Sequence, residues 1–246
     1  MKLLVDIGNS RLKWAIERDG AIGVVRALDH RRPGFIDELR RCWQSVGLPD
    51  TAGIAAVAGK PTVEAITLLV TEMWPGLQAK MPRSVKQAFG VTNAYDQPAK
   101  LGIDRWLALV AAHRTYAGAI CVIDCGTAIT IDVMDAAGKH LGGLICPGLV
   151  MMKQSLAANT AQLTFDPQPF DFGLASETNV AIANGALAAA VGLVEHTMQR
   201  YASGCRLILT GGDAEMLAAS LAMPSIQDKE LVLKGLAMYC SGETIE

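Results

Sequence analysis

The sequence predicts an α/β protein made of two related domains. The main observation is a strand–turn–strand pattern that occurs twice, 118 residues apart, with three identical positions in register: Asp6 with Asp124, Gly8 with Gly126, and Gly20 with Gly138. The composition agrees, because 24 glycines and only 5% aromatic residues favour helices packed closely on sheets over an all-β sandwich. We interpret the pattern as a duplicated domain; two unrelated but similar hairpins are the alternative.

The elements follow in order along the chain. Apolar runs predict strands, and turn residues separate them: residues 2–6, 12–16, 22–27 and 53–58 in the first half, and 120–124, 130–134 and 206–210 in the second. Helical periodicity is expected at residues 33–46, 62–74, 101–116, 149–158 and 184–201, and residues 163–172 are expected to form a loop. The domain boundary is placed near residue 116, which gives domains 1–116 and 117–246.

Charge and cysteine content limit the classes of function. The net charge of −2 is a poor match for nucleic acid, which usually meets a strongly basic face. The six cysteines form no C-x-x-C pair and no disulfide framework, so reduced cysteines in a cytoplasmic protein are expected. The longest apolar stretch contains Asp124 and Asp132, and no signal peptide precedes Asp6. We therefore expect a soluble protein that binds neither nucleic acid nor membrane.

The two repeated turns suggest phosphate binding. Each combines an acid at the end of a strand, one glycine, and a hydroxyl or amide residue: Asp6 to Ser10, and Asp124 to Ala128. Glycine lets backbone N–H groups approach a phosphate closely, and the aspartates suit cations bound beside it. An ordinary hairpin is the alternative for either turn alone. The chain has no Walker loop and no dinucleotide fingerprint.

Several motifs in the chain resemble those of type III pantothenate kinases. They are Asp6-Ile7-Gly8-Asn9-Ser10, Gly102-Ile103-Asp104-Arg105-Trp106, Asp124-Cys125-Gly126-Thr127, the segments 142–148 and 178–185, and Thr210-Gly211-Gly212. The resemblance covers residues 3 to about 237, and the Gly-x-Asp-Arg-Trp element is its most discriminating part. It implies two duplicated actin-like, ribonuclease H-like domains of the acetate-kinase superfamily, with the nucleotide site in the cleft. It also implies a homodimer, for which the Ala-rich helix at residues 186–193 is a possible contact.

The activity implied by the resemblance is ATP-dependent phosphorylation of pantothenate to 4′-phosphopantothenate, the first step of coenzyme A biosynthesis. Asp104 corresponds to the general base. The implied substrate contacts are Tyr95, Gly102, Ile103, Asp104, Arg105 and Thr178. Each has a structural alternative: Asp104 as a helix N-cap, Arg105 as its ion-pair partner, Tyr95 as surface packing, and Thr178 as a cap.

The implied nucleotide contacts are Asp6, Ile7, Gly8, Asn9, Ser10, Arg11, Leu12, Lys13 and Thr127. Asp124 matches the position that binds a monovalent cation, K⁺ or NH₄⁺, and Mg²⁺ is expected near Asp6. Two rival functions stay open: a nucleotide-binding accessory factor for transcription, and a phosphohydrolase on the same fold. The second of these should have an acid that aligns water, and should not need the Gly102–Trp106 element.

Overall fold

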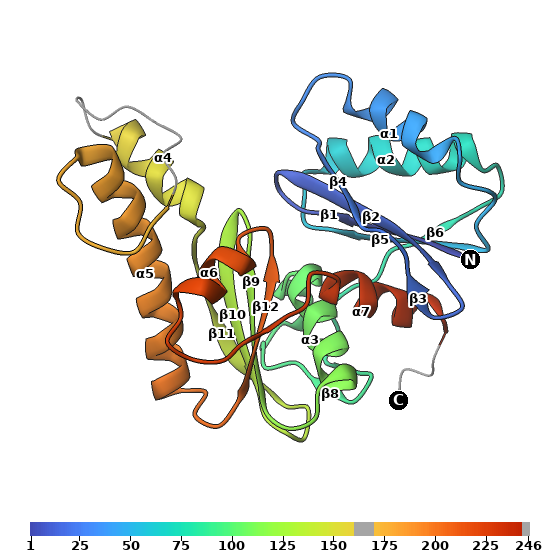
Figure 1. The fold of residues 1–246 in the computed structure, drawn as a ribbon. Helices are drawn as coiled ribbons and strands as arrows, with labels where there is room; N and C mark the ends of the chain where they lie inside the picture. The colour runs from blue at the N-terminus through green and yellow to red at the C-terminus, as the bar shows by residue number, and fades with distance from the viewer. Residues whose placement is uncertain (160–169, 243–246) are drawn as a thin grey trace. The chain divides into compact units, whose positions relative to one another are not determined.

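The computed structural model describes residues 1–159 and 170–242. The chain forms two compact units. The first is Met1–Thr115 together with the C-terminal residues from Glu230 onward, and the second is Tyr116–Lys229. The chain therefore passes between the units twice, and each unit is a sheet with helices packed on it (Figure 1).

The sheet of the first unit has six strands in the order β3-β2-β1-β5-β6, with β4 also paired to β2. The strands are β1 Lys2–Ile7, β2 Arg11–Arg18, β3 Ala21–Ile22, β4 Arg26–Asp29, β5 Thr51–Ala56 and β6 Ala79–Lys80. β1 runs antiparallel to β2 and parallel to β5. All residues of β1 after Lys2 are buried, as expected for a strand covered on both faces.

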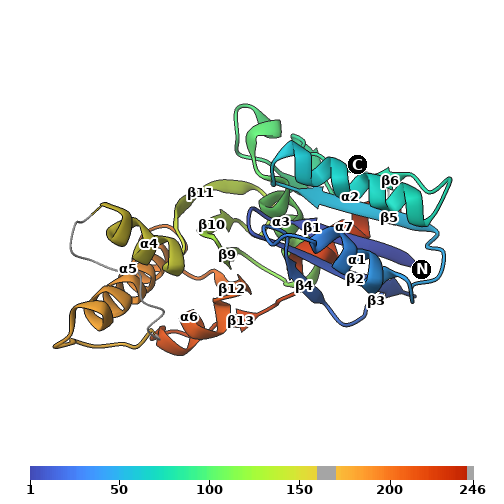
Figure 2. The same cartoon turned by 90° about the horizontal axis from the view of Figure 1, so that it is seen from above.

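Helices α1 (Phe35–Trp43) and α2 (Lys60–Met73) cover one face of this sheet, and α3 (Ile103–Thr115) and α7 (Leu231–Cys240) lie on the other (Figures 1 and 2). Trp43 of α1 packs between two other tryptophans: its ring centroid lies 6.1 Å from that of Trp14 and 5.6 Å from that of Trp74. A small hairpin, β7 (Gln87–Ala88) and β8 (Val91–Thr92), and the 3₁₀ helix η1 (Pro98–Lys100) precede α3.

The predicted strand at residues 22–27 is wrong in its extent. β3 ends at Ile22 and β4 begins at Arg26, and both pair with β2. Between them the Gly23 N–H donates to the Ile16 carbonyl at 2.9 Å, and a Cβ at Gly23 would lie 3.1 Å from the same oxygen. The chain thus stays beside β2 but leaves the regular ladder at this glycine.

The C-terminal helix α7 belongs to the first unit, whereas the predicted second domain extended to residue 246. Its side chains Leu231, Leu233 and Leu236 are buried. Gly235 allows α7 to approach α3 closely, because a Cβ at this position would lie 2.2 Å from the Leu107 carbonyl oxygen. A return of the chain to an earlier unit depends on contacts between residues far apart in sequence, and the local sequence of residues 231–240 does not predict which unit the helix joins.

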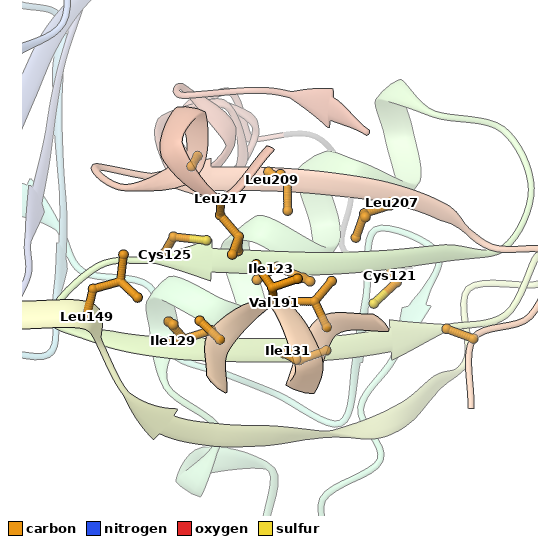
Figure 3. Close-up of a cluster of buried hydrophobic side chains, with 14 of the residues drawn as sticks. Cys121, Ile123, Cys125, Ile129, Ile131, Leu149, Val191, Leu207, Leu209 and Leu217 are labelled. Atoms are coloured by element: carbon orange, nitrogen blue, oxygen red, sulfur yellow. The ribbon is translucent and has the colours of Figure 1, made fainter. Parts of the chain in front are cut away.

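The sheet of the second unit has five strands in the order β11-β10-β9-β12-β13. The strands are β9 Ile120–Cys125, β10 Ala128–Met134, β11 His140–Pro147, β12 Arg206–Gly211 and β13 Ile226–Gln227, and the helices are α4 Leu149–Asn159, α5 Thr178–Arg200 and α6 Ala214–Ser220. Alternate residues of β9, β10 and β12 form a core with α5 and α6, including Ile123, Ile131, Val191, Leu209 and Leu217 (Figure 3).

Helix α5 begins at Thr178, six residues before its predicted start. Among the described residues it is the one helix whose length and composition would allow it to cross a membrane. Its apolar side is accounted for by packing, since Leu187, Val191 and Val194 are buried in the core of the second unit. The part of the predicted loop at 163–169 lies outside the described residues.

The strand pairing confirms the predicted duplication. β1 has an antiparallel partner, β2, on one side and a parallel partner, β5, on the other. β9 is arranged in the same way between antiparallel β10 and parallel β12. The equivalent glycines of the next turns also share one backbone conformation, with φ of 83° at Gly20 and 82° at Gly138, a region that favours glycine.

The pair Tyr116–Asp228 gives a testable pH dependence within the second unit. The Tyr116 hydroxyl donates to Asp228 Oδ2 at 2.9 Å, and burial together with this carboxylate raises the pKa of Tyr116 to about 12. Since the raised pKa belongs to the folded state, the stabilisation is complete below pH about 10 and is lost as pH rises toward about 12. We expect Tyr116→Phe to unfold at lower urea concentration than wild type at pH 8, and this difference to shrink at pH 11.5. A difference independent of pH would contradict the assignment.

Candidate active site

The first predicted phosphate turn joins β1 to β2. The Gly8 N–H donates to the Arg11 carbonyl at 3.0 Å, and His30 Nε2 hydrogen-bonds to the Gly8 carbonyl at 2.7 Å. Both polar backbone groups of this glycine are therefore fixed, and Asn9 is the exposed residue of the turn. The buried His30 was not predicted, because it comes from a loop after β4 and carries no sequence motif.

The predicted nucleotide segment from Asp6 to Lys13 has two faces. Asp6 and Lys13 lie directly opposite each other on β1 and β2, so their side chains share one face of the sheet. Ile7 and Leu12 are fully buried in the core on the other face. A ligand at this turn can therefore meet Ile7 and Leu12 through their backbone only, whereas Asp6 and Lys13 bring charged side chains to the face they share.

The second predicted turn joins β9 to β10 and is one residue shorter than the first. Its Gly126 N–H donates to the Ala128 carbonyl at 3.0 Å, and its exposed residue is Thr127. Two other backbone segments pack on this turn. The Gly148 N–H donates to the Thr127 carbonyl, and the Asp213 N–H donates to the Cys125 carbonyl, both at 3.0 Å.

Glycine is required at residues 148 and 211, which pack on this turn. A Cβ at Gly148 would lie 2.2 Å from the Gly126 carbonyl oxygen, and one at Gly211 would lie 2.4 Å from the Cys125 carbonyl oxygen. Gly211 also has a φ of 94°. The turn is thus held in place by main-chain atoms from the starts of α4 and α6. The sequence motifs contain Gly148 and Gly211, but nothing in them shows that these glycines touch the turn.

Asp124 has oxygen-bearing neighbours. Thr130 on β10 and Thr210 on β12 both lie opposite it in the ladder, on the face that the core does not use. One carboxylate and two hydroxyls suit a hard monovalent cation better than zinc, and the described residues include no cluster of three or more His, Cys, Asp or Glu. Burial, followed by the charges of Asp124 and Asp213, raises the pKa of the Cys125 thiol, which keeps that thiol protonated and unreactive.

The structure brings Tyr95 and Arg105 together. Arg105 Nη1 donates to the Tyr95 hydroxyl at 2.9 Å, and the guanidinium carbon lies 5.7 Å from the centre of the tyrosine ring. Arg105 is only 6% exposed although it is charged. A guanidinium held in one plane is well suited to bind a carboxylate through two N–H groups.

Asp104 lies in the first turn of α3, which begins one residue earlier at Ile103, so the aspartate is inside the helix and is not its N-cap. Its Oδ1 accepts the Arg105 N–H at 2.8 Å, and the residue is half-buried. A Cβ at Gly102 would lie 2.5 Å from Asp104 Oδ1. The glycine therefore leaves room for the carboxylate to fold back over the start of the helix.

Thr178 is the first residue of α5 in the second unit, and it lines a hollow between α4 and α5 of about 590 Å³. The described lining is mostly apolar and includes Met152, Leu156 and Ile182, with a second hydroxyl from Ser155. Such a lining suits an aliphatic ligand with a few polar groups.

Comparisons with known proteins agree with these features. The family model described as type III pantothenate kinase matches residues 2–200. A type III pantothenate kinase from Nitrosococcus oceani is 38% identical, over 96% of this chain and 92% of the relative. The crystal structure of a conserved protein assigned to the Baf family of transcriptional activators, from Campylobacter jejuni, has a TM-score of 0.60 at 22% identity, covering 96% of both chains.

The fold extends to more distant proteins. An activator of 2-hydroxyisocaproyl-CoA dehydratase from Clostridium difficile, solved with bound ADPNP, has a TM-score of 0.55 at 12% identity, covering 100% of this chain and 99% of the other. Its likeness supports the two-unit actin-like fold. The match of the family model to most of the sequence, with the relative at 38% identity, settles the family. The chain belongs to the type III pantothenate kinase family.

Proposed function

We propose that this protein transfers the γ-phosphoryl group of ATP to the primary hydroxyl of pantothenate, producing 4′-phosphopantothenate and ADP for coenzyme A biosynthesis. Family membership supports the reaction. The observation that carries the substrate assignment is the pairing of the Arg105 guanidinium with Tyr95, because the residue before Arg105 in the chain, Asp104, is a proton acceptor, so one short segment supplies both an anion-binding group and a base. Pantothenate has a carboxylate at one end and the reacting hydroxyl at the other.

The substrate residues have separate roles. Arg105 and Tyr95 hold the substrate with the backbone of Gly102 and Ile103, and Thr178 contributes a hydroxyl contact. Asp104 accepts the hydroxyl proton as the substrate oxygen bonds to the γ-phosphorus and the bond to the bridging oxygen of ADP breaks. A carboxylate is sufficient for this step, since the transition state is loose and the proton leaves late.

The two turns serve the nucleotide. The segment Asp6–Lys13 and Thr127 contact the phosphates, mainly through the backbone, and Lys13 adds a positive charge. A kinase of this family uses ATP with a divalent metal, which we assign as Mg²⁺ near Asp6; when bound, it neutralises charge on the phosphates. Asp124 with Thr130 and Thr210 would hold K⁺ or NH₄⁺ near the second turn.

The test is pantothenate-dependent ADP formation by the purified protein with ATP and Mg²⁺. The proposal expects ADP formation to be slow without pantothenate and to rise with its concentration to saturation. ADP formation that is equally fast without pantothenate would support a phosphohydrolase instead, and none under either condition would support a nucleotide-binding accessory role.

The cation assignment gives its own prediction. Replacing K⁺ and NH₄⁺ by tetramethylammonium at constant ionic strength should lower kcat/KM for ATP at least about tenfold, equivalent to about 1.4 kcal/mol of phosphate binding. Asp124→Asn should show a low kcat/KM in both buffers. An Asp124→Asn enzyme that still responds fully to K⁺ would remove this residue from the cation site.

We also propose that the protein is a cytoplasmic homodimer. All six cysteines are free, which suits a reducing compartment. Half of the helix segment predicted for the dimer contact, including Leu187 and Val191, is buried within its own unit. The exposed small residues Ala188 and Gly192 are therefore the part of this segment left for a partner subunit. Light scattering on the purified protein measures the mass directly.

A further inference from the structure

Asn93 is the most completely buried polar residue near the proposed substrate site, with 0% exposure. It lies between β8 and η1, on the loop that carries Tyr95. A buried amide is costly unless its donors and acceptor are all matched. Asn93 therefore has either a structural role in this loop or a role in the site that the loop forms.

Every polar group of Asn93 has a partner among residues 85–98. Nδ2 donates to the carbonyls of Val85 and Pro98, both at 3.2 Å, and Oδ1 accepts the Tyr95 N–H at 3.0 Å. The orientation of the amide is fixed by chemistry, because two carbonyls can pair only with its NH₂ and an N–H only with its oxygen. The backbone of Asn93 is bonded to Lys86 twice, to the carbonyl at 2.8 Å and from Nζ at 2.9 Å.

These bonds connect three parts of the loop to one side chain. The carbonyl of Val85 lies before the small hairpin, the N–H of Tyr95 follows it, and Pro98 begins the 3₁₀ helix that leads to α3. Asp96 and Gln97 between them are exposed. The place of the Tyr95 backbone therefore depends on Asn93, and the Tyr95 hydroxyl in turn meets Arg105 at 2.9 Å.

We infer that Asn93 is a positioning residue for the carboxylate end of the substrate, acting through Tyr95 on Arg105. This inference rests on the proposed function. Loss of the Asn93 side chain frees the Tyr95 loop, and the guanidinium of Arg105 then loses its bond to the Tyr95 hydroxyl. The consequence is specific: recognition of the carboxylate weakens, whereas nucleotide binding and the chemistry at Asp104 are retained.

The experiment compares two substrates in Asn93→Ala, Asn93→Ser and the control Gln97→Ala, an exposed residue of the same loop. One substrate is pantothenate, and the other is its neutral N-alkyl amide, which keeps the reacting hydroxyl but lacks the carboxylate. We expect Asn93→Ala to lower kcat/KM for pantothenate at least about tenfold, mainly through KM, as misplacement of a binding group by a fraction of an ångström does. The KM for ATP and the kcat/KM for the amide should stay within about twofold of wild type.

Asn93→Ser buries no charge and keeps a hydroxyl that can accept the Tyr95 N–H, but it loses the NH₂ group that bonds to both carbonyls, so it provides the measurement if the alanine variant does not fold. The double variant Asn93→Ala/Tyr95→Phe should be no worse than about twofold below Tyr95→Phe alone, since residues acting through one another are not additive. Equal losses for pantothenate and the amide, or a matching rise in the KM for ATP, would overturn the inference and leave a purely structural role. A wild-type protein that phosphorylates neither substrate would instead overturn the proposed function.

Discussion

Replacing Asp104 by asparagine should lower the kcat for pantothenate phosphorylation by about 10²- to 10⁴-fold, the usual contribution of a general base. The amide has nearly the same size as the carboxylate, and its oxygen can still accept the Arg105 N–H that Asp104 Oδ1 accepts at 2.8 Å. The start of α3 should therefore keep its geometry. What the amide cannot do is take the proton of the substrate hydroxyl at neutral pH.

The controls separate catalysis from folding. The KM for ATP and the thermal unfolding midpoint of Asp104→Asn should be close to those of wild type, because the amide is nearly isosteric with the carboxylate and its oxygen keeps the Arg105 N–H as its donor. The measurement is the kcat of Asp104→Asn and of wild type at several pH values between about 6 and 9. A variant that retains more than about a tenth of the wild-type kcat across this range would remove Asp104 as the base.

Gly211→Ala should disturb the second turn strongly. Its Cβ would lie 2.4 Å from the Cys125 carbonyl oxygen and 2.5 Å from Asp124 Oδ1, and its φ of 94° is unfavourable for alanine. The turn and the proposed cation ligand must both move. We expect the second unit to lose about 1–3 kcal/mol of stability, as overpacked sites do, and the KM for ATP to rise at least about tenfold.

Gly212→Ala is the matched control in the same loop. A Cβ at this residue would meet no atom within 4 Å, and the φ of Gly212 is not positive. It should therefore change the unfolding midpoint and the KM for ATP little. Equal effects of the two substitutions on ATP kinetics and urea unfolding would show that the close approach of Gly211 is not what matters.

Much of the fold was predictable, because its signals are local. The two Asp-x-Gly turns, the apolar runs before them and the glycines of the next hairpins mark the duplication directly, and the ladders β2-β1-β5 and β10-β9-β12 confirm it. The break at Gly23 was not predicted. Residues 22–27 have the length and apolar character of one strand, and the sequence does not show that the Gly23 N–H bonds to the Ile16 carbonyl. The return of α7 to the first unit was missed because it depends on contacts with α3, far away in sequence.

The same distinction applies to the candidate site. Tyr95 and Arg105 were implied as separate substrate contacts, and the bond between them was not predicted, although only ten residues separate them. His30 against Gly8, and Gly148 and Gly211 against the second turn, come from distant segments, so no spacing could suggest them. Asn93 was overlooked for another reason: an asparagine in a loop is usually a turn residue, and only its complete burial distinguishes it.

The transcription-related name of the Campylobacter jejuni structure belongs to a protein that shares 22% identity with this chain, which supports the fold alone. The net charge of −2 gives no support to nucleic-acid binding. The residues Gly102, Asp104 and Arg105 are all present in the geometry described above, which an accessory factor without catalysis would not need.

The central claim is tested most directly by mass spectrometry of the reaction products. Purified protein is incubated with ATP, Mg²⁺, K⁺ and pantothenate, and the acceptor is examined for the added phosphoryl group and for its place on the molecule. The account predicts 4′-phosphopantothenate in amounts equal to the ADP formed with wild type, and almost none with Asp104→Asn. ADP formed with unmodified pantothenate, or no ADP at all from a folded protein that binds ATP, would contradict it.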